Sequence, residues 1–243
     1  MYRTLAADEI IATLARLEQR IGERFSGAGL AGVCAELTEI ARQTHRRSSD
    51  IARPNLWLRS IVGIILAAGV ALLVFVGVKL WSNTKASDDL YGTLQGIDAG
   101  FNILVLMGAA LFFLFNIEEM IKRRRALKAL HELRSIIHVI DMHQLTKVPS
   151  TKASVNQPTT SSPKRSLTSY ELARYLDYCS EMLSLTAKVA VLYAQSFPDP
   201  IVTEAVNDIE RTSASLGQKI WQKINIVERM LDRAQAPAQA TES

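Results

Sequence analysis

Two apolar stretches without a charged residue dominate the pattern of hydrophobic and polar positions. Residues 60–78 and 99–117 are each 19 residues long and contain no Asp, Glu, Lys or Arg. As helices they would each extend over roughly 29 Å, about the thickness of a bilayer's hydrocarbon core. Soluble core helices usually keep a polar stripe, and these stretches lack one. The pattern predicts two transmembrane helices, at about residues 60–80 and 97–117, which form a helical hairpin within residues 57–118.

Amphipathic segments precede the first stretch. Apolar residues recur every three or four positions from Ile10 to Phe25, which is typical of a helix with one buried face. Gly27 and Gly29 interrupt this pattern, and a second amphipathic segment begins at Leu30. Residues 1–50 are therefore predicted to form a cytoplasmic helical hairpin.

The second apolar stretch continues into a polar segment without a helix breaker. No Gly or Pro occurs between Gly108 and Pro149, so one helix is predicted from near Ile97 to about Leu145. Residues 119–147 would then form a cytoplasmic stalk. Its apolar seam follows a coiled-coil spacing of 3, 4 and 3 and predicts a partner helix. The seam residues are Leu130, Leu133, Ile137 and Ile140.

The C-terminal part shows a linker followed by two amphipathic helices. Residues 148–166 are rich in Ser, Thr and Pro and are predicted to be a flexible linker. Thr168 and Glu171 have the spacing of a capping box, and Pro200 suits the first position of a second helix. Residues 167–233 are predicted to form an antiparallel helical hairpin, and residues 234–243 a disordered tail. With no convincing strand anywhere, the predicted fold class is all-α, a two-span membrane hairpin with a cytoplasmic bundle or coiled coil.

The net charge of +4 is interpreted from where the basic residues lie along the chain. Five arginines lie within about twenty residues before the first apolar stretch, and six basic residues follow the second. The connection 79–98 has two lysines and three aspartates. The positive-inside rule then places both termini in the cytoplasm of a multi-pass protein in the cell (inner) membrane. Nucleic-acid binding is not expected, whereas lipid headgroups are expected at one basic run. That run is Lys122, Arg123, Arg124 and Arg125.

Small residues recur every four positions in the first apolar stretch, at Gly63, Ala67 and Ala71. This pattern allows close approach of helix backbones in a membrane. It predicts packing between the two spans or between protomers of a homo-oligomer.

A polar cluster beside the stalk seam is the sharpest candidate for a functional site. On a helix, His131, Arg134, His138 and Asp141 fall within an arc of about 80°. Metal binding fits poorly, because roughly 10 Å along the axis separates His131 from His138. An anionic ligand suits the arginine and histidine donors better. The alternative is a structural role, in which these groups hydrogen-bond a neighbouring helix.

The sequence favours interaction or signalling over catalysis. A His-Asp pair, such as His138 and Asp141, without a nucleophile or Gly-rich loop does not define a reaction, so no enzyme, cofactor or metal site is expected. Cys34 and Cys179 provide no disulfide framework in a reducing cytoplasm. We expect a self-associating integral membrane protein with a cytoplasmic helical interaction or sensing module. Its partners would be the bilayer, further copies of the chain, and a cytoplasmic protein or small anionic ligand. The alternative is an oligomeric ion channel or membrane-permeabilising effector gated by its cytoplasmic helices.

Overall fold

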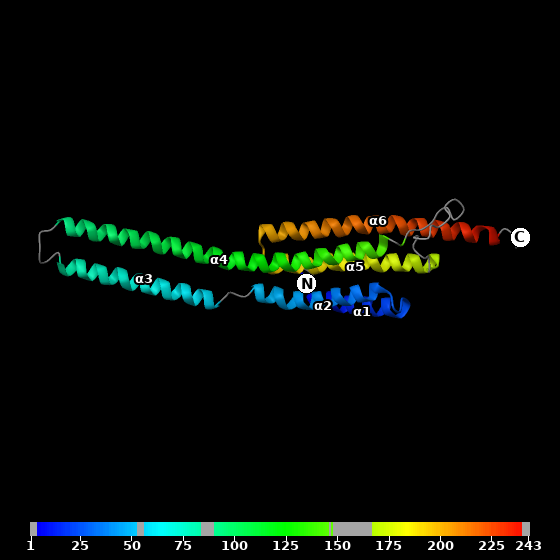
Figure 1. Cartoon of the computed structure of the whole chain (residues 1–243), viewed down its shortest axis with the longest axis horizontal. Coiled ribbons are helices and arrows are strands. Elements are labelled where there is room, and N and C mark those ends of the chain that lie inside the picture. Colours follow the sequence, from blue (N-terminus) through cyan, green and yellow to red (C-terminus); the bar gives the residue numbers. More distant parts are fainter. Residues whose placement is uncertain (1–3, 53–55, 84–89, 146, 148–166, 240–243) are drawn as a thin grey trace, which may run out of the picture. The chain divides into compact units, whose positions relative to one another are not determined.

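The chain forms helices throughout the part that the structure describes. The structure is a computed structural model, which describes residues 4–52, 56–83, 90–145, 147 and 167–239 (Figure 1). Six helices account for nearly all of these residues, and no strand occurs among them. The all-α fold class is confirmed. The helices fall into two compact units, Met1–Ala52 with Arg125–Ser243 and Arg53–Arg124. We refer to them as the bundle unit and the apolar unit.

The bundle unit contains α1 (Ala7–Arg24), α2 (Gly29–Ala52), the last part of α4 (Leu90–Leu145), α5 (Ser169–Ser196) and α6 (Pro200–Gln239). The boundary between the two units falls inside α4. The predicted apolar face of α1 is buried, with Leu14, Leu17 and Ile21 fully covered. Each amphipathic helix here thus removes its apolar face from water, which is the main source of stability for a helix of this kind.

A tight turn joins α1 to α2. The backbone N–H of Phe25 donates to the carbonyl of Ile21 at 2.8 Å, and that of Ala28 donates to Phe25 at 3.0 Å. Gly27 has a φ of +81°, a left-handed conformation that residues with a Cβ rarely adopt. The glycine that interrupts the sequence pattern therefore reverses the chain direction here.

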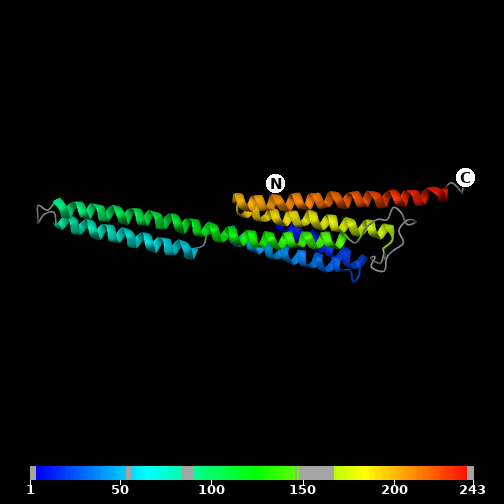
Figure 2. The ribbon, with the colours of Figure 1, turned by 45° about the horizontal axis from the view of Figure 1, so that its top comes forward.

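α5 is the most deeply buried helix of the bundle unit, and α6 lies beside it in both views (Figure 2). The predicted capping box is present at its start: the Thr168 hydroxyl accepts from the Glu171 N–H at 3.2 Å, and the Thr168 N–H donates to Glu171 Oε2 at 2.8 Å. Asp199 caps α6, since its Oδ1 accepts from the N–H groups of Ile201 and Val202 at 3.0 and 3.1 Å.

The apolar seam of α4 is covered by helices of the same chain. All four seam residues are buried. Polar contacts beside the seam reach three neighbouring helices. Arg47 of α2 donates to Glu132 at 2.9 Å, and Lys223 of α6 donates to the Gln144 carbonyl at 3.1 Å. The Tyr175 hydroxyl of α5 lies 3.5 Å from His143 Nδ1. The seam therefore gives no reason to expect a coiled coil with a second copy of the chain.

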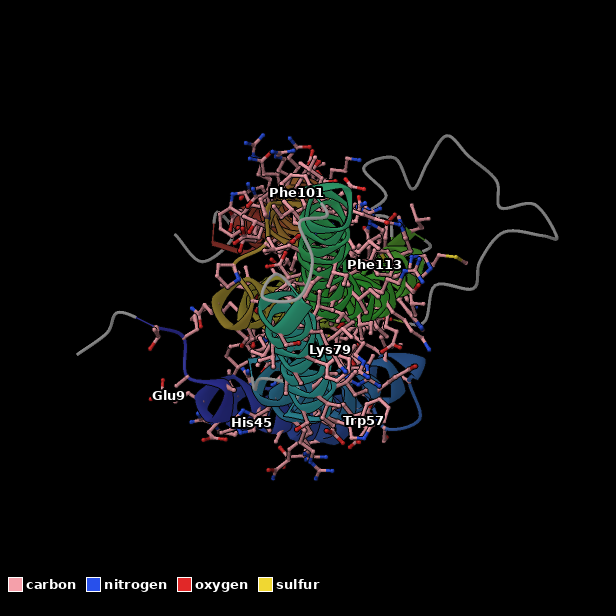
Figure 3. The ribbon with its side chains drawn as sticks, turned by 90° about the vertical axis from the view of Figure 1, so that its left-hand side faces the viewer. Glu9, His45, Trp57, Lys79, Phe101 and Phe113 are labelled. Carbon is pink, nitrogen blue, oxygen red and sulfur yellow. The ribbon has the colours of Figure 1, made fainter. Side chains whose placement is uncertain are left out.

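The apolar unit contains α3 (Leu56–Asn83) and the first part of α4. Both helices are long and apolar enough to cross a membrane, with candidate spans at Ser60–Lys79 and from Leu94 onward. None of the residues in either apolar window is buried. Figure 3 marks Phe101 and Phe113, whose side chains are each 65% exposed. Within this unit α3 and α4 approach closely where Met107 lies against Gly69.

Two helix boundaries differ from the sequence prediction. α4 begins at Leu90 instead of near Ile97, because isolated glycines such as Gly92 and Gly96 weaken a helix without ending it. α6 extends to Gln239, whereas the sequence predicts that the C-terminal pair ends at residue 233 and that a disordered tail follows. The predicted linker 148–166 and the last tail residues 240–243 lie outside the described residues.

The capping box gives the first prediction. Replacing Thr168 with Ala removes the hydroxyl that accepts from Glu171, so the thermal stability of the bundle unit should fall by about 1 kcal/mol. The loss can be measured from the helical circular dichroism signal of the full chain in detergent. Thr168→Ser keeps the hydroxyl and should behave like the wild type. Equal losses in both variants would show that the methyl group of Thr168, and not the cap, stabilises α5.

Candidate functional site

The structure divides the predicted polar cluster on α4 between separate environments. His131 and Arg134 line a pocket of about 300 Å³ together with residues of α6. Arg134 Nη2 lies 3.6 Å from Asp208 Oδ2, and both side chains are nearly half exposed. An ion pair of this exposure contributes little to stability. The same pocket is lined by Glu204. Two carboxylates therefore face the space in which an anion would have to bind.

Asp141 belongs to a hydrogen-bond network between α4 and α6. The Gln144 amide donates to Asp141 Oδ1, and the Lys223 ammonium donates to both the carbonyl and the side-chain oxygen of Gln144. Gln144 is only 2% exposed. Burial lowers the pKa of Lys223, and the negative charge of Asp141 partly offsets this effect. The network has the character of a structural contact, in which buried polar atoms are satisfied across a helix interface.

His138 is exposed, and within the described part of the chain no hydrogen bond or ion pair involves it. The four predicted residues thus share one edge of α4, as their spacing indicated, but do not converge on one point. Ligand binding by this set remains a prediction. Among the described residues, no group of three or more His, Cys, Asp and Glu side chains is placed to hold a metal ion.

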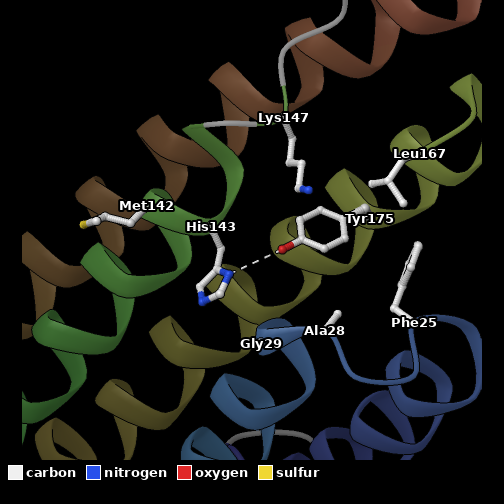
Figure 4. Close-up of a pocket in the computed structure, with 8 residues that line it drawn as sticks. All are labelled: Phe25, Ala28, Gly29, Met142, His143, Lys147, Leu167 and Tyr175. Carbon is white, nitrogen blue, oxygen red and sulfur yellow. Dashed lines mark hydrogen bonds between the residues drawn. The ribbon is translucent and has the colours of Figure 1, made fainter. Parts of the chain in front are cut away.

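His143 lies outside the predicted cluster, because its spacing directs it to another side of the helix. Its imidazole is turned toward Tyr175 of α5, together with Lys147, as Figure 4 shows. His143 lies in the last turn of α4, and Lys147 follows the helix end at Leu145, four positions farther along the chain. That spacing was a visible signal, although the aromatic partner on α5 could not be read from it.

The residues predicted to act in the membrane occupy different surroundings. No heavy atom lies within 4 Å of the position that a Cβ on Gly63 would take, whereas Gly69 is in contact with Met107. The close approach of α3 and α4 therefore uses Gly69, and Gly63 faces open space. In the basic run, Lys122 pairs with Glu118 at 2.9 Å, while Arg124 and Arg125 are exposed.

Comparison with protein-family models, with curated proteins and with solved structures gave no match for this chain. The site and the function have to be argued from the residues themselves.

The network around Gln144 gives the second prediction. Lys223→Met removes the donor to two oxygens of a buried residue, so the free energy of unfolding should fall by about 1–3 kcal/mol. Relief of the buried positive charge offsets part of this loss. Lys219 is exposed on the same helix, and Lys219→Met should change stability by less than about 0.5 kcal/mol. Thermal unfolding of both variants in detergent provides the comparison, and equal stability of the two would contradict the role given to Lys223.

Proposed function

We propose that the chain is an integral protein of the cell's inner membrane whose bundle unit is a cytoplasmic interaction or sensing module. The observation that supports this proposal most strongly is the difference in the burial of apolar side chains between the two units. Most leucine, isoleucine and valine side chains of the described bundle unit are buried, whereas those of α3 and the first part of α4 are largely exposed. Apolar surface of this extent is not stable in water, and a lipid environment removes the cost.

Charge supports the proposed orientation. Arginines precede α3, and basic residues follow the apolar part of α4, where Arg124 and Arg125 are exposed. Lys122 is held by Glu118 and is therefore less available to lipid. Exposed arginines at a membrane boundary attract anionic headgroups and are retained on the cytoplasmic side. We infer that Arg124 and Arg125 make the main headgroup contacts of the basic run.

Two exposed surfaces support an interaction role. In the bundle unit, Val139, Met142 and Leu145 are exposed at three-residue intervals on α4. In the apolar unit, the face with Gly63, Ala67 and Ala71 is open at Gly63, so it is free to receive another helix in the membrane. The first surface suits a cytoplasmic protein partner, and the second suits a further copy of the chain.

The membrane topology gives the third prediction, which labelling can test without removing the native thiols. Cys34 and Cys179 are both buried, and burial raises the pKa of each to about 12. Near neutral pH they remain buried thiols, which react slowly. In spheroplasts of the Ser87→Cys variant, the new cysteine should therefore be the one that reacts with a membrane-impermeant maleimide, while Cys34 and Cys179 stay unlabelled. A cysteine replacing the exposed Ser215 of α6 should react only after lysis.

The opposite pattern, with Ser87→Cys protected until lysis and Ser215→Cys reactive from outside, would invert the proposed orientation. Extraction of the chain from membranes by alkaline carbonate would contradict membrane insertion altogether.

Self-association gives the fourth prediction. Gly63→Leu places a bulky side chain on the open small-residue face, so the oligomer seen by native mass spectrometry in detergent should dissociate into smaller species. Ile64 is exposed beside it, and Ile64→Leu should leave the copy number unchanged. A monomeric wild type, or an oligomer that survives Gly63→Leu, would remove this face as the protomer contact.

The competing function is an ion channel. It requires several copies of the chain, because two membrane helices cannot enclose a water column. Asn116 lies in the apolar part of α4, and its amide donates to the Phe112 carbonyl of its own helix at 2.7 Å. Its hydrogen-bonding capacity is therefore partly used within the helix. Ion flux through liposomes that contain the purified chain would favour the channel over the interaction module.

A further inference from the structure

A pocket of about 410 Å³ lies in the bundle unit where the α1–α2 turn, the end of α4 and the start of α5 meet (Figure 4). Three polar side chains from two separate segments line it: His143, Lys147 and Tyr175. The volume is within the range of ligand pockets, which are mostly apolar with a few converging polar groups. Among the described residues that line this pocket, none is acidic.

The polar groups of this pocket keep unused hydrogen-bonding capacity. Tyr175 is only 4% exposed, yet its hydroxyl lies 3.5 Å from His143 Nδ1, at the outer limit for a hydrogen bond. Burial raises the pKa of Tyr175, so the phenol keeps its proton and can donate it. The Lys147 ammonium stands 5.4 Å from the centre of the Tyr175 ring. In the described part of the chain it has no carboxylate partner.

The position of the imidazole depends on the absence of a side chain at residue 29. A Cβ on Gly29 would stand 2.8 Å from His143 Cε1, closer than real Cβ contacts. Any other residue at the start of α2 would therefore push His143 aside. Since α2 begins here, the positive end of its dipole adds to the electrostatic potential beside the three donors.

The remaining wall is apolar. Phe25 packs edge-to-face on Tyr175, with ring centroids 5.4 Å apart, and Ala28 and Leu167 line the pocket beside it. A ligand that fills this space would have a flat or compact apolar body next to Phe25 and Leu167. Its anionic oxygens would lie between Lys147, His143 and the Tyr175 hydroxyl.

We propose that this pocket binds a small amphipathic anion, with a carboxylate or phosphate group held by His143, Lys147 and Tyr175 and an apolar body against Phe25 and Leu167. It suits an anion better than the pocket at His131 and Arg134, which Glu204 and Asp208 also line. The proposal concerns the bundle unit alone and goes beyond the membrane function proposed above. Failure of ligand binding would leave the membrane topology untouched.

Calorimetric titration of the full chain in detergent, with a blank titration into micelles, gives the fifth prediction. Benzoate carries a carboxylate and phenyl phosphate carries a phosphate, each on the same apolar phenyl ring. At least one of the two should bind saturably at one site per chain. Benzamide has the same ring without the charge and should bind at least roughly tenfold more weakly than benzoate if the head group is a carboxylate. Inorganic phosphate, which lacks the ring, should bind more weakly than phenyl phosphate.

Two variants locate the site. Lys147→Met and Tyr175→Phe should each weaken the binding of the preferred anion by roughly fivefold or more. Tyr175→Phe keeps the ring contacts with Phe25 and therefore serves if Lys147→Met loses its helical signal. Lys219→Met is the matched control outside the pocket and should bind like the wild type. His131→Gln tests the pocket between α4 and α6, and an anion bound at His143 leaves its affinity unchanged.

Four results would overturn the proposal. The first is that neither benzoate nor phenyl phosphate binds, and the second is that benzamide binds as tightly as benzoate or inorganic phosphate as tightly as phenyl phosphate, whichever anion is preferred. The third is an unchanged affinity in both Lys147→Met and Tyr175→Phe. The fourth is a loss of binding in His131→Gln. The last result would move the anion to the pocket between α4 and α6.

Discussion

The structure depends on where each helix places its apolar side chains. In the bundle unit every helix has a polar face and an apolar face, and the apolar faces of α1, α2, α5 and α6 and of the last part of α4 meet in one core. α3 and the first part of α4 have no polar face, and their apolar windows are unburied. Burial of apolar area is worth about 25 cal/mol per Å². The bundle unit gains this free energy from contacts among its own helices. The windows of the apolar unit gain none of it within the described chain, and this contrast supports the membrane proposed around them.

The seam of α4 shows that a spacing pattern can predict a partner helix without identifying it. Leu130, Leu133, Ile137 and Ile140 have the spacing of a coiled coil, and a pattern of this kind specifies a neighbour without saying from which chain it comes. Here α2, α5 and α6 supply that neighbour, through contacts such as Arg47 with Glu132 and Lys223 with Gln144. A bundle within one chain has no association entropy to overcome, so it competes well with an oligomer of the same composition.

Sequence reasoning succeeded where a local rule decides the structure. Helix starts at Thr168 and Pro200, the break at Gly27, and the unbroken helix up to Leu145 all follow from neighbouring residues. The sequence places the candidate site on one face of α4, but it does not predict which residues of other helices lie opposite that face. Asp208 and Glu204 lie some seventy residues farther along the chain, and periodicity does not say that they would stand opposite Arg134. His143 falls outside the predicted cluster by its helical spacing. Its neighbours Tyr175 and Gly29 come from α5 and the start of α2, and periodicity does not identify them.

The pocket at His143 is assembled from segments that are far apart in the chain, and this has a thermodynamic consequence. His143 lies in the last turn of α4 and Lys147 follows that helix, whereas Tyr175 belongs to α5 and Leu167 precedes it. A ligand that bonds both groups binds only when the two segments are packed together, so it favours the assembled bundle over any state in which they separate. At a ligand concentration one hundred times Kd the assembled state gains about 2.7 kcal/mol. That is comparable to the effect of a whole buried side chain, so an anion at this pocket would hold the end of α4 against α5.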